Sequence, residues 1–447
     1  MLPGLLVMMT VMTASSWTRV HSALVVRSSL GARPLVTMGR RRRRHDDLPP
    51  RTPRTMTHAI DGLPPLVART DPERYEHLLR DKVSNMESLL TEAIGRPLPP
   101  TEIFESQREH FRMRAAFTVW LEGPHAHYVM FERDAPKQPV EVPYYPMGST
   151  RLCDLMPPLL AAIETEPGLR ERINDVRFLT TLEGDALVSM TYNRPIDADE
   201  RWRTAAERLT QTLPRAPDGR PVKLVGRSRK VKQVVGGETV REILSVRNRG
   251  KCIYTQTEGA FSQPNARVCE HMLSWAYDST LGLGDTDLCE LYCGNGCFTI
   301  ALAPNFRRVV ATEMSKASVE LAQRNLAANG VDNVAVARLS AEDFVLAHRG
   351  AKRFQRLDEA GIELGGRHAD RMRTLLVDPP RAGLDTTCRE LAASFERVLY
   401  ISCNPETLAR DLAELSATHD VKRVAAFDQF PYTPHLEGGL LLERREQ

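Results

Sequence analysis

Residues 287–296 read DLCELYCGNG, a short apolar run that ends in a Gly-x-Gly turn. The apolar run predicts a buried strand, and the turn after it lets a ligand approach the backbone closely. The next predicted strand, RRVVATE at 307–313, ends in the acidic residue Glu313. This order of strand, glycine turn and acid is typical of a nucleoside site, in which the carboxylate accepts hydrogen bonds from a ribose. The third glycine of the dinucleotide fingerprint is missing, which favours S-adenosylmethionine over NAD.

Strands and helices alternate from this stretch to the C-terminus, as in a parallel, doubly wound sheet. A leading helix is predicted at 265–280, and further helices are predicted at 316–328, 341–348, 385–396 and 406–416. Buried strands are predicted at 333–339, 374–378 and 397–402, followed by two terminal strands. Residues 350–371 are predicted to form an exposed loop. We therefore expect an α/β Rossmann-like domain over residues 261–447.

The chain before residue 261 follows a different pattern, in which strands outnumber helices and neighbouring strands pair. Strands are predicted at 111–121, 127–133, 176–182 and 186–193, with further strands between residues 222 and 256. Helices are predicted at 72–90, near 154–165 and at about 198–213. This order predicts an α+β domain with an antiparallel sheet over residues 65–260.

The first 64 residues are predicted to stay outside the fold. Residues 1–56 contain ten arginines against two aspartates, and no acidic residue precedes Asp46. A segment that is rich in arginine and serine and has no acidic residue is typical of an organellar transit peptide. A translation start at Met38 or Met56 would instead place this extension outside the protein. The protein is predicted in the cytoplasm, or in a mitochondrion or plastid if residues 1–56 are a transit peptide. No run of about 18 apolar residues occurs, so no membrane span is predicted.

Basic residues are concentrated in one segment of an otherwise acidic body. Beyond residue 56 the chain has 50 basic and 55 acidic residues, yet residues 220–251 hold ten lysines or arginines against Glu238 and Glu242. A polyanionic partner must therefore be held by a local patch. The residues predicted to contact its phosphates are Lys223, Arg227, Arg229, Lys230 and Lys232.

The eight cysteines include no C-x-x-C pair, and their spacing is not that of the disulfide framework of an extracellular protein. A reducing compartment is therefore expected. Cys289, Cys293 and Cys297 recur every four residues, a spacing that a metal or an iron–sulfur cluster can use. The predicted strand-to-turn context would not point all three thiols one way. No metal site is therefore predicted.

Two further strands end in reactive or acidic residues on the side of the glycine turn. Asp378 opens the sequence DPPR, in which Arg381 stands where an amino-methylating enzyme would place an aromatic ring. Cys403 ends the next strand, just before a helix that begins near Glu406 and whose N-terminus is expected to help stabilise a thiolate. Such a thiolate can add to carbon 6 of a pyrimidine and so make carbon 5 nucleophilic enough to accept a methyl group.

A candidate base precedes the last strand. The adduct formed by Cys403 must lose its carbon-5 proton before the thiol can leave, so a base is required. Glu437, in the sequence PHLEGG at 434–439, is the candidate, and His435 is the competing one.

Six stretches of the chain match the pattern of one known family. They are FSQPNA (261–266), ELYCGNG (290–296), ATE (311–313), VDPPRAGLD (377–385), YISCNPETL (400–408) and FDQFPYTPHLEGG (427–439). On these stretches, and over about residues 70–447, the chain resembles the tRNA (uracil-5-)-methyltransferase family, whose members make 5-methyluridine in the T loop of tRNA. The resemblance implies a class I methyltransferase domain that uses S-adenosylmethionine, preceded by an RNA-binding domain that holds the T arm of tRNA. A tmRNA is a further expected substrate, and a monomer is expected.

The resemblance also implies a role for each matching residue. Cys403 would be the nucleophile and Glu437 the base. The residues expected at the cofactor or the substrate are Gln263, Tyr292, Gly294, Gly296, Glu313 and Asp378. Cys297 stands where this family commonly has asparagine, so we expect a backbone contact there and, at most, weaker cofactor binding.

Two alternative functions remain open. Ribosomal-RNA relatives usually carry an added N-terminal barrel and a four-cysteine iron–sulfur motif, which this sequence does not show, so tRNA is favoured. A tRNA-binding or folding factor with incidental methylation would use the basic segment equally well but would not require Cys403, Asp378 or Glu437.

A T-loop uridine is stacked, so it must be flipped out to reach Cys403.

Overall fold

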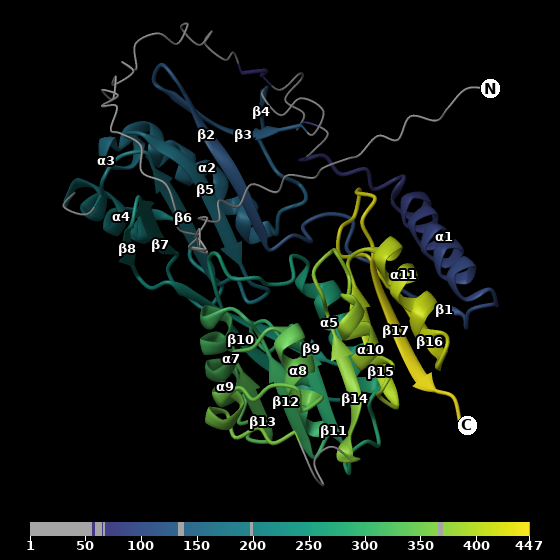
Figure 1. Ribbon diagram of the computed structural model, residues 1–447. Helices are drawn as coiled ribbons and strands as arrows, with labels where there is room; N and C mark the ends of the chain where they lie inside the picture. Colours follow the sequence, from purple (N-terminus) through teal and green to yellow (C-terminus); the bar gives the residue numbers. More distant parts are fainter. Residues whose placement is uncertain are drawn as a thin grey trace, which may run out of the picture. The chain divides into compact units, whose positions relative to one another are not determined.

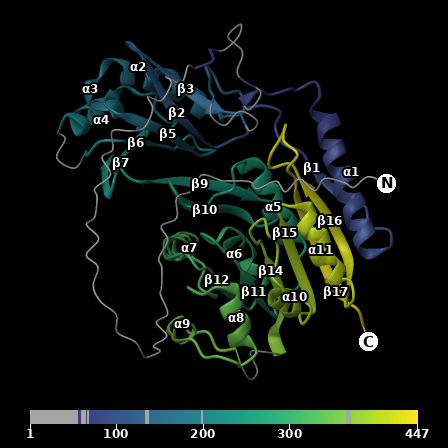
Figure 2. The same ribbon diagram turned by 45° about the horizontal axis from the view of Figure 1, so that its top comes forward.

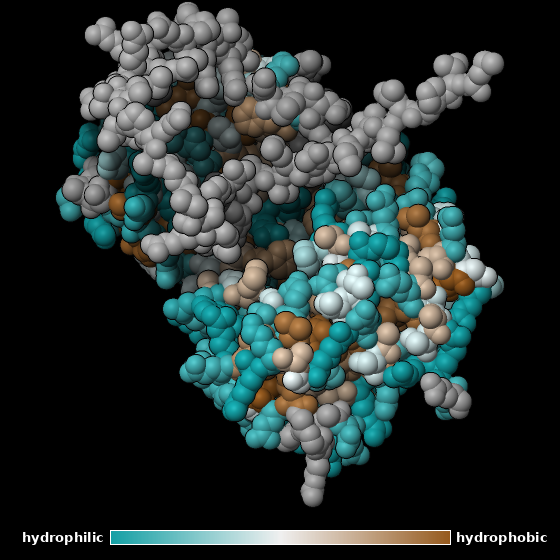
Figure 3. Space-filling model, viewed as in Figure 1, coloured by the Kyte–Doolittle hydropathy of each residue, from teal (hydrophilic) through white to brown (hydrophobic). Residues whose placement is uncertain are grey.

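The computed structural model describes residues 56–58, 65, 68–132, 138–196, 200–364 and 370–446. The span from Arg54 to Gln447 forms one compact unit, whereas Met1–Pro53 is a separate unit outside the described residues. The predicted transit peptide lies almost entirely in that separate unit. No helix among the described residues is long and apolar enough to cross a membrane. The face drawn in Figure 3 is mainly hydrophilic, with hydrophobic residues in small groups.

An eight-stranded sheet carries most of the C-terminal half of the chain (Figure 1). Its strands lie in the order β1-β16-β17-β15-β14-β11-β12-β13. Their bounds are β1 Thr101–Phe104, β11 Asp287–Leu291, β12 Arg308–Thr312, β13 Val334–Ala337, β14 Met372–Val377, β15 Arg397–Ser402, β16 His419–Phe427 and β17 Glu437–Arg444. The strands from β15 to β13 are parallel, and β17 is antiparallel to both neighbours. The chain order reverses between β11 and β14, and doubly wound sheets bind ligands at the carboxyl ends of their strands at such a point.

Helices alternate with these strands and cover both faces of the sheet, as the sequence predicted. One face packs against α8 (Ala341–His348), α10 (Thr386–Ala392) and α11 (Pro405–Leu415). The other face packs against α5 (Ala266–Asp278), α6 (Cys297–Leu302) and α7 (Lys316–Ala328), and a 3₁₀ turn at Ala303–Asn305 follows α6.

The predicted loop at residues 350–371 is only partly exposed. It contains the short helix α9 (Gln355–Glu359), in which Leu357 is buried, and Ile362 after the helix is buried as well. The apolar side chains are too few and too irregular for a helical period, so the sequence pattern did not reveal them.

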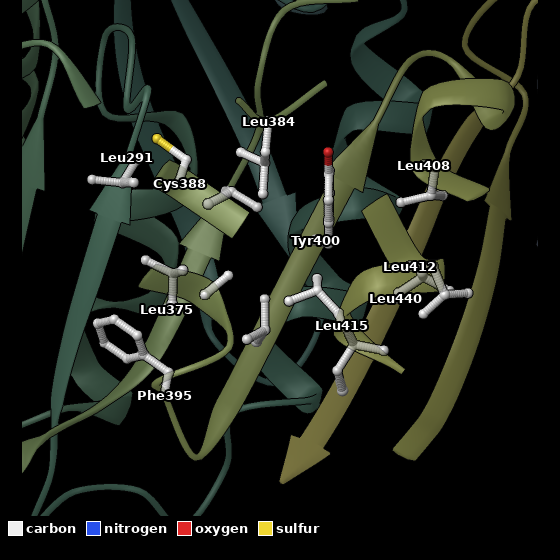
Figure 4. Close-up of a cluster of buried hydrophobic side chains, with 14 of the residues drawn as sticks. Leu291, Leu375, Leu384, Cys388, Phe395, Tyr400, Leu408, Leu412, Leu415 and Leu440 are labelled. Atoms are coloured by element: carbon white, nitrogen blue, oxygen red, sulfur yellow. The ribbon is translucent and has the colours of Figure 1, made fainter. Parts of the chain in front are cut away.

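The core beneath α10 and α11 consists mainly of leucine side chains (Figure 4). Leu408, Leu412 and Leu415 recur at helical spacing along α11 and share one buried cluster with Tyr400 of β15. Burying each such side chain stabilises the fold by about 1.5–3 kcal/mol. The Tyr400 hydroxyl donates to Oδ2 of buried Asp411 at 2.6 Å, so its polar end is satisfied inside the core. This packing holds the end of β15 in place.

A seven-stranded sheet of mainly antiparallel strands precedes the eight-stranded one in the chain, in an α+β arrangement as predicted. Its order is β4-β3-β2-β5-β6-β7-β8, and only β6 and β7 are parallel. The bounds are β2 Arg114–Glu122, β3 His125–Phe131, β4 Pro139–Glu141, β5 Ile173–Thr180, β6 Ala186–Tyr192, β7 Lys223–Ser228 and β8 Val231–Val235. One face is covered by α2 (Thr150–Thr165), α3 (Pro167–Arg170) and α4 (Glu200–Thr212).

Three segments that the sequence assigned to the α+β domain pack instead with the eight-stranded sheet. α1 (Tyr75–Ile94) lies along α11, and β1 pairs with β16. The hairpin of β9 (Thr239–Val246) and β10 (Gly250–Thr257) packs against α5 and α7 (Figure 2). The apolar sides of these segments face α5, α7 and α11, so the predicted boundary at residue 260 does not separate the two sheets.

Residues 56–58, which the sequence placed in the extension ending at residue 64, lie against β4. The Thr57 N–H donates to the Pro139 carbonyl at 2.9 Å, and the Glu141 N–H donates to the Thr57 carbonyl at 3.0 Å. The Met56 side chain is buried. These three residues belong to the fold, which corrects the predicted limit of the extension.

Candidate active site

Four chain segments meet side by side at the carboxyl edge of the eight-stranded sheet. The register pairs Leu291 with Val377, Val377 with Tyr400, and Ser402 with Gly438. Because β17 is antiparallel to β15, its first residue lies at the edge where β15 ends. The residues that lie just beyond these pairs at the edge are Tyr292, Asp378, Cys403 and Glu437. Sheet order thus brings together residues that lie up to 145 positions apart in the sequence.

Glu437 is buried at this edge, with 4% of its surface exposed. Its Oε2 atom has no hydrogen-bond partner among the described residues. Burial and the nearby Asp378 carboxylate raise the pKa of Glu437 to about 8, although Arg381 acts in the opposite direction. Burial also raises the pKa of Asp378, to about 7. Two acidic groups are therefore held in an environment that favours their neutral forms.

The Cys403 thiol shares this environment. Burial, then the carboxylates of Glu437 and Asp378, raise the pKa of Cys403 to about 11, and Arg381 opposes the increase. The sequence led us to expect that the following helix helps to stabilise a thiolate, and this stays a prediction. α11 begins at Pro405, two residues after Cys403, while desolvation and two nearby acids favour the neutral thiol.

The loop that carries Arg381 is fastened to the segment that carries Cys403. Asn404 Nδ2 and Thr407 Oγ1 each donate to the Arg381 carbonyl at 3.2 Å. The Leu384 N–H donates to Oδ2 of buried Asp411 at 2.8 Å, which fixes the far end of the same loop. The sequence motifs around 378 and 403 therefore build one structure and set the guanidinium near the thiol.

The loop before Glu437 is held by α1, whose apolar side includes the fully buried Met86. Lys82 Nζ donates to Asp428 and also to the carbonyls of Phe430 and His435, at 3.2 and 3.3 Å. The His435 ring lies edge-on to the Phe430 ring, with centroids 6.1 Å apart. Sequence analysis gave Lys82 no role, because the contacts cross about 350 positions of the chain.

Gly438 lies where no side chain fits. A Cβ atom there would come within 2.7 Å of Leu408 Cδ2 and 3.1 Å of Met86 Sδ. Glycine at this position lets α1 and α11 close over the start of β17 and so keeps Glu437 buried.

The glycine turn after β11 forms one wall of a crevice next to these residues. Gly294 has φ +57°, and a Cβ built on it would meet nothing within 4 Å, so the turn is open toward a ligand. Tyr292 also has a positive φ of 63°, a strained conformation that concentrates at functional sites. Glu313 accepts from the backbone N–H groups of Gly294 at 3.1 Å and Ser315 at 2.6 Å, which fixes its carboxylate beside the turn.

The crevice is lined by most of the residues predicted to bind the cofactor. These are Gln263, Tyr292, Gly294, Cys297 and Asp378, joined by Phe261, Glu290 and Asn295 among others. Gln263 Oε1 is buried without a hydrogen-bond partner among the described residues, so a bound ligand would complete it. An unpaired amide oxygen, several carboxylates and an open glycine turn fit the amino, hydroxyl and purine groups of S-adenosylmethionine.

Glu290 is a site residue that the sequence analysis did not single out. It is buried, accepts a hydrogen bond from Thr299 Oγ1 at 2.6 Å, and burial raises its pKa to about 8. An acidic residue inside the apolar run DLCELYC was a signal that could have identified it.

Cys297 keeps the place predicted for it at the start of α6. Its carbonyl accepts from the Tyr254 hydroxyl at 2.8 Å, and its Sγ atom lies 3.7 Å from Cys269 Sγ. Cysteine in place of the family's common asparagine therefore puts two thiols, those of Cys269 and Cys297, at the wall of the crevice.

The basic residues predicted to contact phosphates lie apart from this crevice, on the β7–β8 hairpin of the seven-stranded sheet. Lys223 is paired with buried Asp185 at 2.7 Å, Arg227 with Glu258 at 2.8 Å, and Lys232 with Glu238. The two exposed residues at the turn of the hairpin, Arg229 and Lys230, have no ion pair among the described residues.

Comparisons with known proteins point to one family. Residues 74–445 match the sequence profile of the family described as tRNA (Uracil-5-)-methyltransferase. A relative from Azotobacter vinelandii, named tRNA/tmRNA (uracil-C(5))-methyltransferase, is 50% identical over 375 residues, which cover 84% of this chain and 98% of the relative. A relative of the same name from Vibrio cholerae is 45% identical over 376 residues, with the same coverage.

A solved structure shares the fold. The Pyrococcus abyssi tRNA (uracil-54, C5)-methyltransferase in complex with S-adenosyl-L-homocysteine matches with a TM-score of 0.59. It is 20% identical, and the match covers 82% of this chain and 83% of that chain.

Proposed function

Because the chain belongs to the tRNA (uracil-5-)-methyltransferase family, as its sequence stretches predicted, we propose that it methylates carbon 5 of a uridine in the T loop of tRNA, at position 54, and also acts on tmRNA. The observation that carries the proposal is the row of Asp378, Cys403 and Glu437 at one sheet edge, beside a crevice that fits S-adenosylmethionine. The family uses S-adenosylmethionine, which supplies an electrophilic methyl group when bound.

The residues that would hold the cofactor are those of the crevice together with Glu313, which lies beside the glycine turn. Glu313, fixed by two backbone N–H groups, offers its remaining lone pairs to ribose hydroxyls. Gln263 Oε1 and the acids Glu290 and Asp378 offer acceptors for an amino group. The open turn at Gly294 leaves room for the ligand to approach the protein backbone.

Cys403 would act first on the uracil ring. Its sulfur forms a bond to carbon 6, and the electron pair of the 5,6 double bond moves toward the carbonyl oxygen at carbon 4 to give an enolate. The thiol proton must pass to a base or to solvent before this step, and the pKa of about 11 means that the free protein holds it. Arg381 favours the thiolate, so its loop, fastened by Asn404 and Thr407, prepares the nucleophile.

Glu437 would then release the product. After carbon 5 has gained the methyl group, the carboxylate takes the carbon-5 proton, the 5,6 double bond forms again, and the bond from carbon 6 to sulfur breaks. The raised pKa of about 8 makes Glu437 a stronger base than an exposed glutamate, once it has lost its own proton. Burial serves the reaction here because it keeps bulk water away from the adduct.

The RNA must present a flipped uridine to this edge, because a stacked base cannot reach Cys403. We place phosphate contacts at exposed Arg229 and Lys230 rather than at Lys223, Arg227 and Lys232, whose charges are already paired. We place the enzyme in the cytoplasm unless residues 1–56 direct it to an organelle, which a fluorescent fusion of those residues would reveal.

The direct test is to incubate unmodified tRNA with the protein and labelled S-adenosylmethionine and to analyse the nucleosides by mass spectrometry. We expect labelled 5-methyluridine, lost when the uridine at position 54 is replaced by cytidine and abolished in Cys403→Ala. A modified nucleoside other than 5-methyluridine would overturn the proposal. Labelling of ribosomal RNA but not tRNA would assign the activity to the alternative substrate.

A further inference from the structure

Two histidines and a glutamate meet at the edge of the seven-stranded sheet, on a different sheet from Cys403 and Glu437. His127 lies on β3, Glu141 ends β4, and His58 belongs to the short segment that runs beside β4. Their ligand atoms all lie within 4.8 Å of one another. The proposed methylation does not use any of the three.

The strand register explains why these side chains share one face. Val129 pairs with Glu141, so His127, two residues before Val129, projects to the same side as Glu141. Thr57 pairs in parallel with Val140, which puts the next residue, His58, beside Glu141. Ala126 and Tyr128 face the core under the helices, so the cluster lies on the opposite side of the sheet.

The distances bring one carboxylate between two imidazole rings. His58 Nδ1 lies 3.2 Å from Glu141 Oε2, and His127 Nδ1 lies 2.7 Å from Glu141 Oε1. The two rings are steeply inclined, at 76°, with centroids 5.6 Å apart. The side chains of His127 and Glu141 are 18% and 19% exposed, whereas His58 is 59% exposed and forms the solvent side of the cluster.

We propose that His58, His127 and Glu141 bind a divalent transition-metal ion, with zinc as the best match. Imidazole nitrogens and a carboxylate oxygen are ligands that zinc takes, with one position left for water. A tetrahedral zinc ion with its usual bond lengths separates neighbouring ligand atoms by about 3.3 Å. His58 Nδ1 lies 3.2 Å from Glu141 Oε2, whereas His127 Nδ1 lies 2.7 Å from the other oxygen, Oε1. The three ligand atoms lie within 4.8 Å of one another, so small side-chain rotations would bring both rings to one carboxylate oxygen at the zinc spacing.

Glu122 completes the set as an outer partner. His58 Nε2 lies 3.5 Å from Glu122 Oε2, so the ring nitrogen that faces away from Glu141 meets a second carboxylate. Metal-binding histidines commonly donate their second N–H to such a group, which orients the ring and strengthens the ligand. With the proton on Nε2 toward Glu122, the Nδ1 atom that contacts Glu141 would be the metal ligand.

The ion would fasten the start of the folded chain to the sheet. Residues 56–58 are attached to β4 by two backbone hydrogen bonds and by the buried Met56 side chain. A metal that joins His58 to His127 would tie this segment to β3 as well. The site is therefore a structural one in this proposal, and it links residues 56–58 to the seven-stranded sheet.

The test uses the full chain and zinc itself. Equilibrium dialysis after chelation should show one tightly held zinc ion per chain, and His127→Gln or Glu141→Gln should weaken its binding at least a hundredfold. Glu122→Gln removes only the outer partner and should weaken it about tenfold. His125→Gln is the matched control, because His125 is exposed on the same strand and faces Glu164 at 3.5 Å. That variant should bind zinc as the unaltered chain does.

Cobalt(II) substitution and melting provide independent readouts. The cobalt form should absorb in the visible range as a four-coordinate nitrogen and oxygen site, and zinc should raise the melting temperature of the unaltered chain and of His125→Gln but not of His127→Gln. A sulfur-to-cobalt charge-transfer band would place the ion on cysteines and overturn the proposal. Equal zinc affinity in the unaltered chain and His127→Gln would also overturn it and leave hydrogen bonds alone as the role of the cluster.

Discussion

At the edge of the eight-stranded sheet, Glu437 is buried with an oxygen that has no partner among the described residues, whereas on the β7–β8 hairpin Lys223 is paired with buried Asp185 at 2.7 Å. In the reaction that we propose, substrate and cofactor would complete the polar groups of the first region. The second region has already neutralised most of its charges within the protein. The comparison teaches that a local density of charge in the sequence does not by itself indicate a free binding surface, because the fold can pair those charges within the protein.

The largest expected effect separates the roles that we propose for Cys403 and Glu437. Glu437→Gln keeps the Cys403 thiol but removes the group that takes the carbon-5 proton, so we expect turnover to fall at least a thousandfold and a methylated protein–RNA adduct to accumulate. The adduct is measured as a slow band on a denaturing gel with labelled cofactor. Cys403→Ala should form no adduct.

His435→Gln is the matched control for that experiment. His435 lies in the same loop, but its ring faces Phe430, so this variant should turn over without trapping RNA. An adduct that accumulates with His435→Gln and not with Glu437→Gln would reassign the base.

The next effect tests whether Lys82 of α1 stabilises the loop before Glu437. Lys82→Met removes the cation that faces Asp428, whose side chain is 1% exposed, and leaves a buried carboxylate without its partner. We expect a loss of about 3–5 kcal/mol in the free energy of unfolding, measured by urea denaturation. Lys316→Met is the control, since Lys316 forms an exposed pair with Glu320 and should cost less than about 1 kcal/mol. Equal losses in the two variants would show that α1 does not hold this loop.

A third effect follows from the raised pKa of Glu437. The folded chain keeps the proton up to about pH 8, whereas an unfolded glutamate releases it near its ordinary pKa of 4.5. The folded state therefore binds more protons across this window, so its stability falls as the pH rises from about 4.5 to about 8. Glu437→Gln should remove this contribution and gain up to a few kcal/mol at pH 8 relative to pH 5. If the melting temperatures of the two chains changed in parallel between pH 5 and pH 8, the raised pKa of Glu437 would be contradicted.

A smaller effect concerns the hairpin. Neutralising Arg229 and Lys230 together should weaken tRNA binding and reduce the slope of log affinity against log salt by up to about one unit for each lost contact. Lys232→Gln is the matched control, because its charge is already opposed by Glu238. A slope that changes only with Lys232→Gln would place the RNA on the paired residues instead.

The smallest effect distinguishes the extension from the fold. A chain that starts at Met56 should retain full methylation activity, because the segment it lacks precedes both sheets. A chain that starts at Pro65 also loses buried Met56 and the hydrogen bonds of Thr57, and should melt a few degrees lower. The two melting temperatures would be equal if residues 56–58 did not pack on β4.

Local signals explain which elements the sequence predicted well. The bounds of α7 and α8 agree with the prediction because Ser315 and Ser340 cap them and apolar side chains repeat along them. The strands β1 and β4 were missed because four and three residues are too few to show an alternation. The domain boundary was misplaced because an amphipathic segment such as α1 does not state in its own sequence which surface it covers.

The sequence by itself was enough to predict the chemistry that we propose, since Cys403, Asp378 and Glu437 each stand in a short motif that a strand end and a turn can present. Only the tertiary structure decided the protonation of those residues and the partners of the charged ones. Desolvation and Coulomb energies depend on groups that the fold brings near, such as Lys82 beside Asp428 or Asp185 beside Lys223. Helix and strand patterns arise from neighbours in the chain, whereas the electrostatic state of a site arises from neighbours in space.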